Sequence, residues 1–382
     1  MPDLAPVVMP EREELSQLVL ELHADGSPWV PSGLGNHLHW GAALQADAGM
    51  VLSMARCNRV IHHAVADFTV TVEAGLGLAK LQEVLAAQDQ WLPLDPPLAG
   101  PSSIGGLVAR GLSGRLRHRY RDLRDQLLGI SLLRSDGTAA KAGGKVVKNV
   151  AGYDLMRLFC GSWGSLGLIS ELTLRTMPLP KGRQIVQLKG ALEDLQQLRQ
   201  QLLLHSSMAL EFIEWRQGPG AATCLQLGLC NLAQEQQLQL QLTPSIQLEK
   251  LPQPTTSTTT STTTSTTVEA GQWLLRLGLE PVKIVEFMQD PVAQGWQLQL
   301  GAASGLGLAQ AAFEGMAPYR VEALRRACER RSGYLTVLQS PNNSKLDAWA
   351  DVKAKPLIEA VKKQFDPLNQ LCRGRLPGVA SC

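Results

Sequence analysis

The sequence predicts an α+β protein, because helical and strand-like apolar patterns alternate along it and a strand hairpin lies among them. Residues 15–22 carry apolar side chains at i, i+3, i+4 and i+7, the spacing of an amphipathic helix. Residues 78–85 present one apolar helical face, whereas residues 51–54 and 68–72 are short apolar runs typical of strands. The first half of the chain therefore mixes helices and strands.

A hairpin and a proline-marked boundary complete the first half. Residues 127–133 and the stretch after Thr138 are strand-like and flank the turn at residues 135–137. Residues 168–176 form the last strand pattern, with apolar and polar side chains alternating, before Pro178 and Pro180 interrupt it. We therefore predict one domain over residues 1–180 and a second over residues 181–382.

The second half predicts a smaller α+β domain. Residues 282–288 suit a strand or a helix, residues 321–331 suit a helix, and residues 334–338 suit a strand. Residues 255–267 contain only Thr and Ser, so they have nothing to bury and predict a solvated linker or loop.

Composition excludes several classes of protein. Of 382 residues, 45% are hydrophobic and 18% charged, enough for a sizeable core, and the net charge of +2 argues against a dedicated nucleic-acid binder. The seven cysteines include no C-x-x-C pair, which argues against a disulfide framework or a cysteine-ligated metal and favours a reducing compartment. No apolar stretch approaches the ~20 residues of a membrane helix, and residues 1–14 lack the apolar region of a secretory signal. We expect a soluble, cytoplasmic protein.

Glycine-rich turns are the main indication of a ligand. They lie at residues 32–36, 101–106, 110–114 and 161–169, each where a strand pattern ends. Turns without Cβ atoms let successive backbone N–H groups close around a diphosphate, and small Ser hydroxyls add donors. Together the turns favour an extended dinucleotide. A Rossmann site is disfavoured, because Gly33-x-Gly35, Gly75-x-Gly77 and Gly305-x-Gly307 all lack the third glycine, and no P-loop occurs.

Two stretches of the sequence carry a specific resemblance. Residues 148–155, KNVAGYDL, followed by residues 161–171, GSWGSLGLISE, resemble the FAD-binding domains of the vanillyl-alcohol oxidase type, also called PCMH-type. Within that family, KNVAGYDL-x-RL-x-x-GS with LPLDPP upstream is most similar to the FAD-binding subunits of the glycolate oxidase and dehydrogenase family. The resemblance is strongest over residues 25–180. Near the C-terminus, residues 365–375 resemble the family's closing segment, although Cys372-Arg373 stands where Asn-Pro is usual.

The resemblance implies a two-lobed FAD-binding domain followed by a reduced cap domain, with a C-terminal tail that returns to the FAD domain. It implies that FAD is held non-covalently, although His37 and His39 lie near the place where some relatives tether it. It places the diphosphate at the first two turns, the ribityl chain and flavin ring near the third, and the adenosine half at the fourth. The implied cofactor-binding residues are Ser32, Gly33, Leu34, Gly35, Asn36, Pro101, Ser102, Ser103, Gly105, Gly106, Gly111, Ser113, Gly164, Gly167, Leu168 and Ile169.

The resemblance also implies a reaction and partners. It implies an FAD-dependent oxidoreductase acting on CH–OH groups, a flavoprotein subunit of a glycolate or other 2-hydroxy acid oxidase or dehydrogenase. The partners would be a larger FAD-linked subunit and an iron–sulfur subunit, through which the protein would lie at the membrane periphery. Related catalytic subunits hold a metal with histidines of their second domain, whereas this chain has only His205 there, so we expect no metal site.

The catalytic role is left open. No residue is identified as the base, and Tyr153 and His118 are candidates by placement alone. His62-His63 reads most simply as a solvated loop pair. The basic residues between Arg110 and Arg124 suit an anion-guiding or docking patch, or a solvated loop. The alternatives to a catalytic subunit are a non-catalytic FAD-binding relay or assembly subunit and a stand-alone FAD-linked oxidase of other specificity.

Overall fold

The structure is a computed structural model that describes residues 6–45, 47–96, 101–144, 154–252, 271–341 and 344–380. The chain folds into two compact units. The first unit comprises Met1–Ser113, Asp122–Leu179 and Asp347–Cys382, and the second comprises Gly114–Arg121 and Pro180–Leu346. The main division in the sequence therefore lies at Leu179 and Pro180, and the C-terminal segment packs with the first unit.

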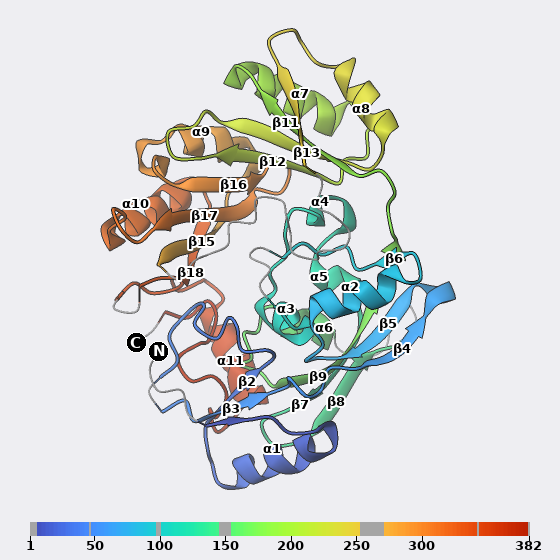
Figure 1. Ribbon diagram of the computed structural model, residues 1–382. Helices are drawn as coiled ribbons and strands as arrows, with labels where there is room; N and C mark the ends of the chain where they lie inside the picture. The colour runs from blue at the N-terminus through green and yellow to red at the C-terminus, as the bar shows by residue number, and fades with distance from the viewer. Residues whose placement is uncertain are drawn as a thin grey trace. The chain divides into compact units, whose positions relative to one another are not determined.

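The first unit is built on a five-stranded antiparallel sheet in the order β4-β5-β9-β7-β8 (Figure 1). A three-stranded parallel sheet, β1-β3-β2, and an antiparallel pair, β10-β6, accompany it. The strands of this unit are β1 (Val7–Val8), β2 (Trp29–Ser32), β3 (Met50–Ser53), β4 (Val60–Ala64), β5 (Thr69–Glu73), β6 (Gln90–Trp91), β7 (Leu127–Leu133), β8 (Ala139–Gly143), β9 (Leu168–Arg175) and β10 (Met177–Pro178). Its helices are η1 (Arg12–Glu14), α1 (Leu15–Ala24), η2 (Val65–Asp67), α2 (Leu78–Ala86), α3 (Ile104–Arg110), α5 (Leu123–Gln126), α6 (Leu155–Phe159) and α11 (Lys355–Phe365).

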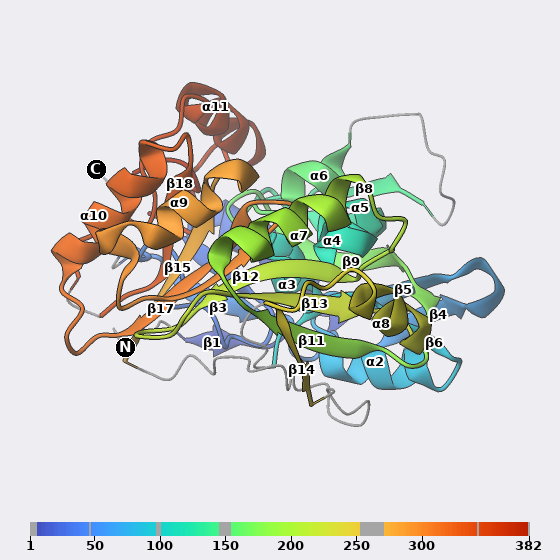
Figure 2. The same ribbon diagram turned by 90° about the horizontal axis from the view of Figure 1, so that it is seen from above.

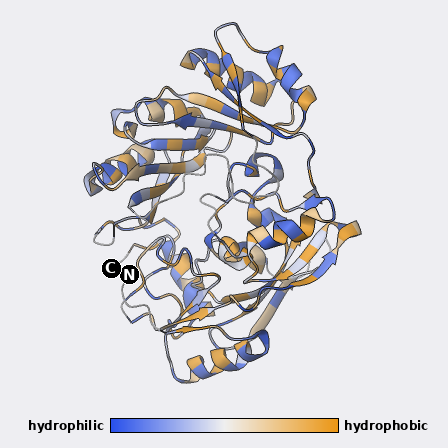
Figure 3. Ribbon diagram, viewed as in Figure 1, coloured by the Kyte–Doolittle hydropathy of each residue, from blue (hydrophilic) through white to orange (hydrophobic). Residues whose placement is uncertain are grey.

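The apolar patterns of the sequence explain these elements. Leu15, Val19 and Leu22 of α1 are buried, as their helical spacing predicts. The predicted hairpin is confirmed, since β7 and β8 pair antiparallel around residues 134–138 and β9 pairs with β7 on its other side. Hydrophilic and hydrophobic residues are interspersed along many of the helices and strands (Figure 3). Helices α3, α5 and α6 pack against this sheet and cover the core.

The second unit is an eight-stranded antiparallel sheet in the order β14-β11-β13-β12-β16-β17-β15-β18. Helices α7, α9 and α10 lie over one face of this sheet (Figure 2), and a single apolar cluster fills the space between them. The strands are β11 (Gln184–Lys189), β12 (Phe212–Gln217), β13 (Cys224–Leu229), β14 (Gln247–Leu251), β15 (Gln272–Gly278), β16 (Gln297–Gly301), β17 (Leu306–Ala312) and β18 (Tyr334–Gln339). The helices are α4 (Arg117–Tyr120), α7 (Leu192–Leu204), α8 (Leu232–Gln239), η3 (Pro281–Lys283), α9 (Ile284–Gln289), η4 (Pro291–Ala293) and α10 (Pro318–Glu329).

The predicted elements of the second half are present, and the ambiguous stretch at residues 282–288 is a helix. Ile284, Val285, Phe287 and Met288 of α9 are all buried, which explains why neither periodicity stood out in the sequence. The α+β fold class is confirmed. The Thr/Ser tract at residues 255–267 lies outside the described residues. Among the described residues, no helix combines the length and apolarity needed to span a membrane.

One local prediction was wrong. His62 and His63 do not form a loop but lie in β4, where they pair with Thr71 and Val70 of β5. His62 is exposed, and Nε2 of His63 lies 3.1 Å from Oε1 of Gln90. Two adjacent histidines carry no apolar alternation, so the strand pairing of this edge segment left no pattern in the sequence.

A buried lysine fastens the C-terminal segment to the first unit. Nζ of Lys362 in α11 donates to Oδ2 of Asp366 (2.5 Å) and to the carbonyls of Ser165 (2.9 Å) and Leu371 (2.8 Å). Asp366 also accepts hydrogen bonds from the backbone N–H groups of Gln370 and Leu371. The segment after α11 thus lies beside β2, where Leu371 bridges to Trp29 in parallel. Ser165 belongs to the fourth glycine-rich turn, so this anchor also holds that turn.

We expect Lys362→Met to destabilise the protein by about 3 kcal/mol or more, because it leaves the buried carboxylate of Asp366 without its cation. Chemical denaturation of the purified chain measures the effect. Lys363→Met, at the exposed neighbouring position, is the matched control. Equal stability of the two variants would contradict the anchoring role.

A second buried charge lies at the end of β5. Glu73 is buried and accepts hydrogen bonds from the backbone N–H of Arg59 (2.8 Å) and from Nη2 of the same residue (2.9 Å). Burial raises the pKa of Glu73, but the hydrogen bonds and charge of Arg59 outweigh burial and hold the pKa below its ordinary value of 4.5. The ionised carboxylate therefore stabilises the fold.

This direction predicts a pH dependence. A carboxyl whose pKa is lowered by folding contributes stability that is fully present above pH 4.5 and is lost as the pH falls through the lower pKa of the folded state. We expect the stability difference between the wild type and Glu73→Gln to be largest near neutral pH and to shrink below pH 4.5. Denaturant titrations between pH 3 and 7 give the profile, with Glu83→Gln as a surface control. A difference independent of pH would contradict this account.

Candidate cofactor-binding site

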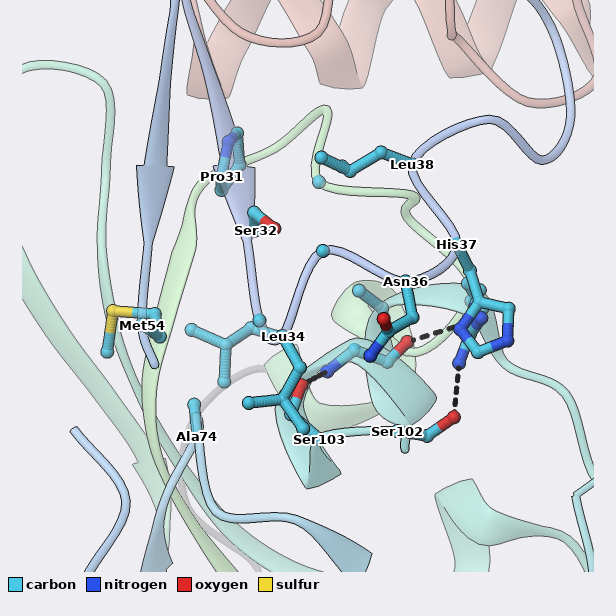
Figure 4. Close-up of a pocket in the computed structure, with 18 of the residues that line it drawn as sticks. Pro31, Ser32, Leu34, Asn36, His37, Leu38, Met54, Ala74, Ser102 and Ser103 are labelled. Atoms are coloured by element: carbon cyan, nitrogen blue, oxygen red, sulfur yellow. Dashed lines mark hydrogen bonds between the residues drawn. The ribbon is translucent and has the colours of Figure 1, made fainter. Parts of the chain in front are cut away.

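Three of the glycine-rich turns meet in one pocket of the first unit (Figure 4). Fourteen of the sixteen predicted cofactor-binding residues line it: Ser32, Gly33, Leu34, Gly35, Asn36, Pro101, Ser102, Ser103, Gly105, Gly106, Gly164, Gly167, Leu168 and Ile169. The pocket is open on one side and, with the solvent at its mouth, has a volume of about 760 Å³. The structure therefore brings together residues more than 130 positions apart in the sequence.

The first turn leaves the end of β2 and packs directly on the second. Oγ of Ser53 donates to the carbonyl of Gly33 (3.0 Å), which ties this turn to β3. A Cβ atom on Gly33 would lie only 1.8 Å from Oγ of Ser103, so the approach of the two turns requires glycine here. Nδ2 of Asn36 donates to the carbonyl of Pro101 (2.7 Å) and joins the turns a second time.

The second turn is held by the segment that follows β5. The backbone N–H groups of Ile104 and Gly105 donate to the carbonyls of Leu76 (2.9 Å) and Ala74 (2.8 Å). Ser103 caps α3 by accepting a hydrogen bond from the backbone N–H of Gly106 (3.1 Å). Oγ of Ser103 is thus engaged with the backbone of its own turn, and Gly105 and Gly106 add no side chain to the pocket wall.

The fourth turn precedes β9 and rests on α3. The backbone N–H groups of Gly161 and Trp163 donate to the carbonyls of Val108 (3.0 Å) and Ala109 (2.7 Å). Gly164 has φ +75°, a conformation that favours glycine. The bond from Lys362 to the carbonyl of Ser165 fastens this turn from behind.

The third turn contributes less than predicted. Gly111 and Ser113 are not among the residues that line the pocket. Gly111, at φ +59°, ends α3. Oγ of Ser113 donates to Oδ1 of Asp122 (2.5 Å) and accepts from the backbone N–H of Leu123 (3.1 Å), so it supports the start of α5.

Sequence reasoning missed two buried arginines of the pocket. In the sequence, Arg110 stands out only as the first member of a basic stretch, and Arg375 only as part of the closing segment. Nε of Arg375 donates to the carbonyl of Ala42 (3.2 Å) and its Nη2 to that of Leu38, so Arg375 holds the loop that follows the first turn. Burial lowers the pKa of Arg375. Glycine-rich turns are visible in the local sequence, whereas the burial of these two arginines is not.

The polar groups of the pocket suit an anion with many acceptors. Nη1 of Arg110 and Oγ of Ser32 are buried and have no hydrogen-bond partner among the described residues. Burial lowers the pKa of Arg110 to about 10, and none of the carboxylates in the described part of the chain pairs with it. The buried cation of Arg110 and the buried hydroxyl of Ser32 are hydrogen-bond donors, and a diphosphate offers acceptor oxygens for both. The residues present therefore fit the cofactor that the sequence predicts.

The remaining candidates lie elsewhere. Tyr153 and the KNVAGY stretch fall outside the described residues. His118 lies in α4 of the second unit, where burial and the neighbouring Arg119 lower its pKa. Arg115 and Arg119 belong to the same unit: the guanidinium of Arg115 lies 3.9 Å from the ring centre of Phe212, and Nη1 of Arg119 donates to the carbonyl of Ala209 (3.0 Å). Arg110 therefore lines the pocket, Arg115 and Arg119 contact other residues of the second unit, and Arg124 is exposed in the first unit.

Comparisons with known proteins agree with this site. Residues 5–143 match the family described as FAD binding domain. The E. coli glycolate oxidase subunit GlcE is 31% identical over 209 residues, which cover 54% of this chain and 55% of GlcE. The mitochondrial D-lactate dehydrogenase [cytochrome] of Arabidopsis thaliana is 37% identical over 183 residues, 47% of this chain and 31% of that protein. A solved structure of alkyldihydroxyacetonephosphate synthase matches 97% of this chain and 78% of its own, with a TM-score of 0.71 at 15% identity.

These findings bear on the fold, the cofactor and the relatives of the chain. The structural likeness and the match of residues 5–143 to the FAD binding domain family support the predicted PCMH-type fold and FAD as the cofactor. The resemblance to glycolate oxidase subunits is also confirmed, because GlcE and the Bacillus subtilis subunit GlcD, 30% identical over 185 residues, are among the relatives. The chain spans about half the length of GlcE and about a third of the Arabidopsis dehydrogenase.

We expect Gly33→Ala to weaken FAD binding at least tenfold, because the new Cβ must push the first turn away from Ser103. Flavin fluorescence quenching on the apoprotein measures affinity. Gly144→Ala, where a Cβ meets nothing within 4 Å, is the control. Gly33→Ala/Ser103→Gly removes both clashing side-chain atoms and is expected to recover part of the affinity. Unchanged binding by Gly33→Ala alone would show that the contact of the two turns is not needed.

Proposed function

We propose that this chain binds FAD in the pocket of the first unit and serves as a flavoprotein subunit that oxidises a small 2-hydroxy acid. The observation that carries the proposal is the meeting of three side-chain-poor turns and a buried arginine in one pocket. The names of the relatives support the substrate class, since they include glycolate oxidase subunits, D-lactate dehydrogenases and D-2-hydroxyglutarate dehydrogenases. Glycolate is the first substrate to test.

The residues of the chain have defined tasks in this proposal. Ser32, Ser102 and the backbone N–H groups of the first two turns bind the diphosphate, and Gly164, Gly167, Leu168 and Ile169 hold the adenosine half through small side chains and backbone groups. When bound, FAD supplies the two-electron chemistry that the side chains of the protein lack. The interlocked turns hold the cofactor extended. No residue of the described chain is proposed as the base.

The proposal includes partners. GlcE and GlcD are named as subunits of one kind of oxidase, which supports a heteromeric complex with a larger FAD-linked subunit. An iron–sulfur subunit that carries electrons onward, and peripheral attachment to a membrane through these partners, complete the proposal. Affinity purification of the tagged chain from its native cells, followed by mass spectrometry and iron analysis, tests the assembly.

A second candidate is a subunit that binds FAD but does not turn over a hydroxy acid alone. The distribution of histidines favours it, because six of the seven precede residue 181 and only His205 follows. A histidine is the side chain best suited to exchange a proton near neutral pH. The second half of the chain therefore offers little acid–base chemistry from this residue type.

We expect the purified chain to show the two visible absorption bands of oxidised flavin, and anaerobic glycolate to bleach them. Bleaching would establish oxidation by this chain. Retained bands that bleach only after the larger subunit is added would favour the relay or assembly role. Bleaching by D-lactate or another hydroxy acid, with no co-purifying partner, would favour a stand-alone oxidase. A colourless protein that free FAD does not reconstitute would overturn the proposal as a whole.

A further inference from the structure

Arg110 occupies an unusual position for an arginine. It is the last residue of α3, and its side chain turns back along the helix toward the second turn. Nε donates to the carbonyl of Gly106 (3.2 Å), and Nη2 donates to Oγ of Ser102 (3.3 Å). The guanidinium also lies 5.1 Å from the ring centre of Trp40. These contacts fix the guanidinium in one orientation at the wall of the pocket.

The electrostatics of this position are unfavourable for the protein alone. Arg110 is only 8% exposed, and no carboxylate among the described residues forms an ion pair with it. Its protein contacts are a carbonyl, a hydroxyl and an aromatic ring, all of which are neutral. An ion removed from water normally requires an opposite charge nearby, because neutral partners replace only part of its hydration. A stable charge at this place therefore indicates an anionic ligand.

The unused donor indicates which part of a ligand is bound. Nη1 of Arg110 has no partner in the described structure, and neither has Oγ of Ser32 in the first turn. Both residues line the pocket: Ser32 begins the first turn, and Arg110 ends α3, the helix that starts within the second turn. In FAD both negative charges are on the diphosphate, which lies midway along the molecule. Two buried donors of the same pocket, one of them a cation, suit this group better than an uncharged sugar or ring.

We propose that Arg110 is the residue that recognises the diphosphate of FAD, with Nη1 donating to a diphosphate oxygen while Gly106, Ser102 and Trp40 hold the guanidinium in place. This inference rests on the proposed function, since it requires FAD in this pocket. It makes Arg110 a specificity residue that favours the dinucleotide over riboflavin. It also explains why the side chain of Arg110 is buried although no carboxylate of the described residues pairs with it.

The test compares three probes on the apoprotein: FAD, ADP and riboflavin. ADP carries the diphosphate without the flavin, and riboflavin carries the flavin without the diphosphate. We expect Arg110→Met to weaken FAD and ADP binding by about 10- to 100-fold, the range of a charge-assisted hydrogen bond, and to leave riboflavin binding unchanged. Arg110→Lys keeps the charge without the planar fork and is expected to lie between the wild type and Arg110→Met. Calorimetry or fluorescence quenching gives the affinities.

Arg56→Met is the matched control, because Arg56 lies in the same unit and is well exposed. The unfolding temperature of each apoprotein separates a ligand role from a structural one. If Arg110 serves the ligand, apo Arg110→Met is expected to unfold at or above the temperature of the wild type, since it removes an uncompensated buried charge. A large drop in that temperature would assign the arginine to the fold and overturn the inference.

The outcomes also separate the two proposals. If wild-type protein does not bind FAD, the proposed function fails and this inference with it. If the wild type binds FAD, and Arg110→Met binds both FAD and ADP as tightly as the wild type does, only the inference fails. If Arg110→Met loses FAD and riboflavin affinity but keeps ADP affinity, Arg110 contacts the flavin, and the diphosphate assignment is wrong.

Discussion

The contact between the first two glycine-rich turns is the constraint on which the site depends. Gly33 packs so closely on Ser103 that no side chain can stand between them, and Asn36 closes the same contact through Pro101. The two turns follow different strands, so their approach fixes the end of β2 against the start of α3. Such a contact positions backbone N–H groups more rigidly than long side chains would, because little conformational freedom is left to lose on binding.

A second layer of interactions supports these turns from behind. Lys362 reaches the fourth turn through Ser165, and Arg375 reaches the loop after the first turn through Leu38 and Ala42. Both cations belong to the C-terminal segment, which is more than 170 residues from these turns in the sequence yet packs with the first unit. The C-terminal segment therefore completes the first unit, although the family match ends at residue 143.

The sequence predicted the elements with strong local patterns and the turns with strong local composition. The hairpin of β7 and β8, the helix α1 and the glycine-rich turns all follow from residues close together in the chain. The sequence did not predict the two cations of the pocket, because the burial of Arg110 and Arg375 depends on segments far apart in the sequence. His62 and His63 show the same limit, since only pairing with β5 makes them part of a strand. Contacts between segments distant in the sequence therefore determine the burial of the two arginines and the strand conformation of the two histidines.

Hydrogen–deuterium exchange with and without FAD tests the central claim most directly. The account predicts that FAD slows amide exchange at residues 32–36, 101–106 and 162–169 together. Exchange rates in the eight-stranded sheet of the second unit should change much less. Protection at one of these turns without the others, or protection confined to the second unit, would contradict a single cofactor site formed by the three turns.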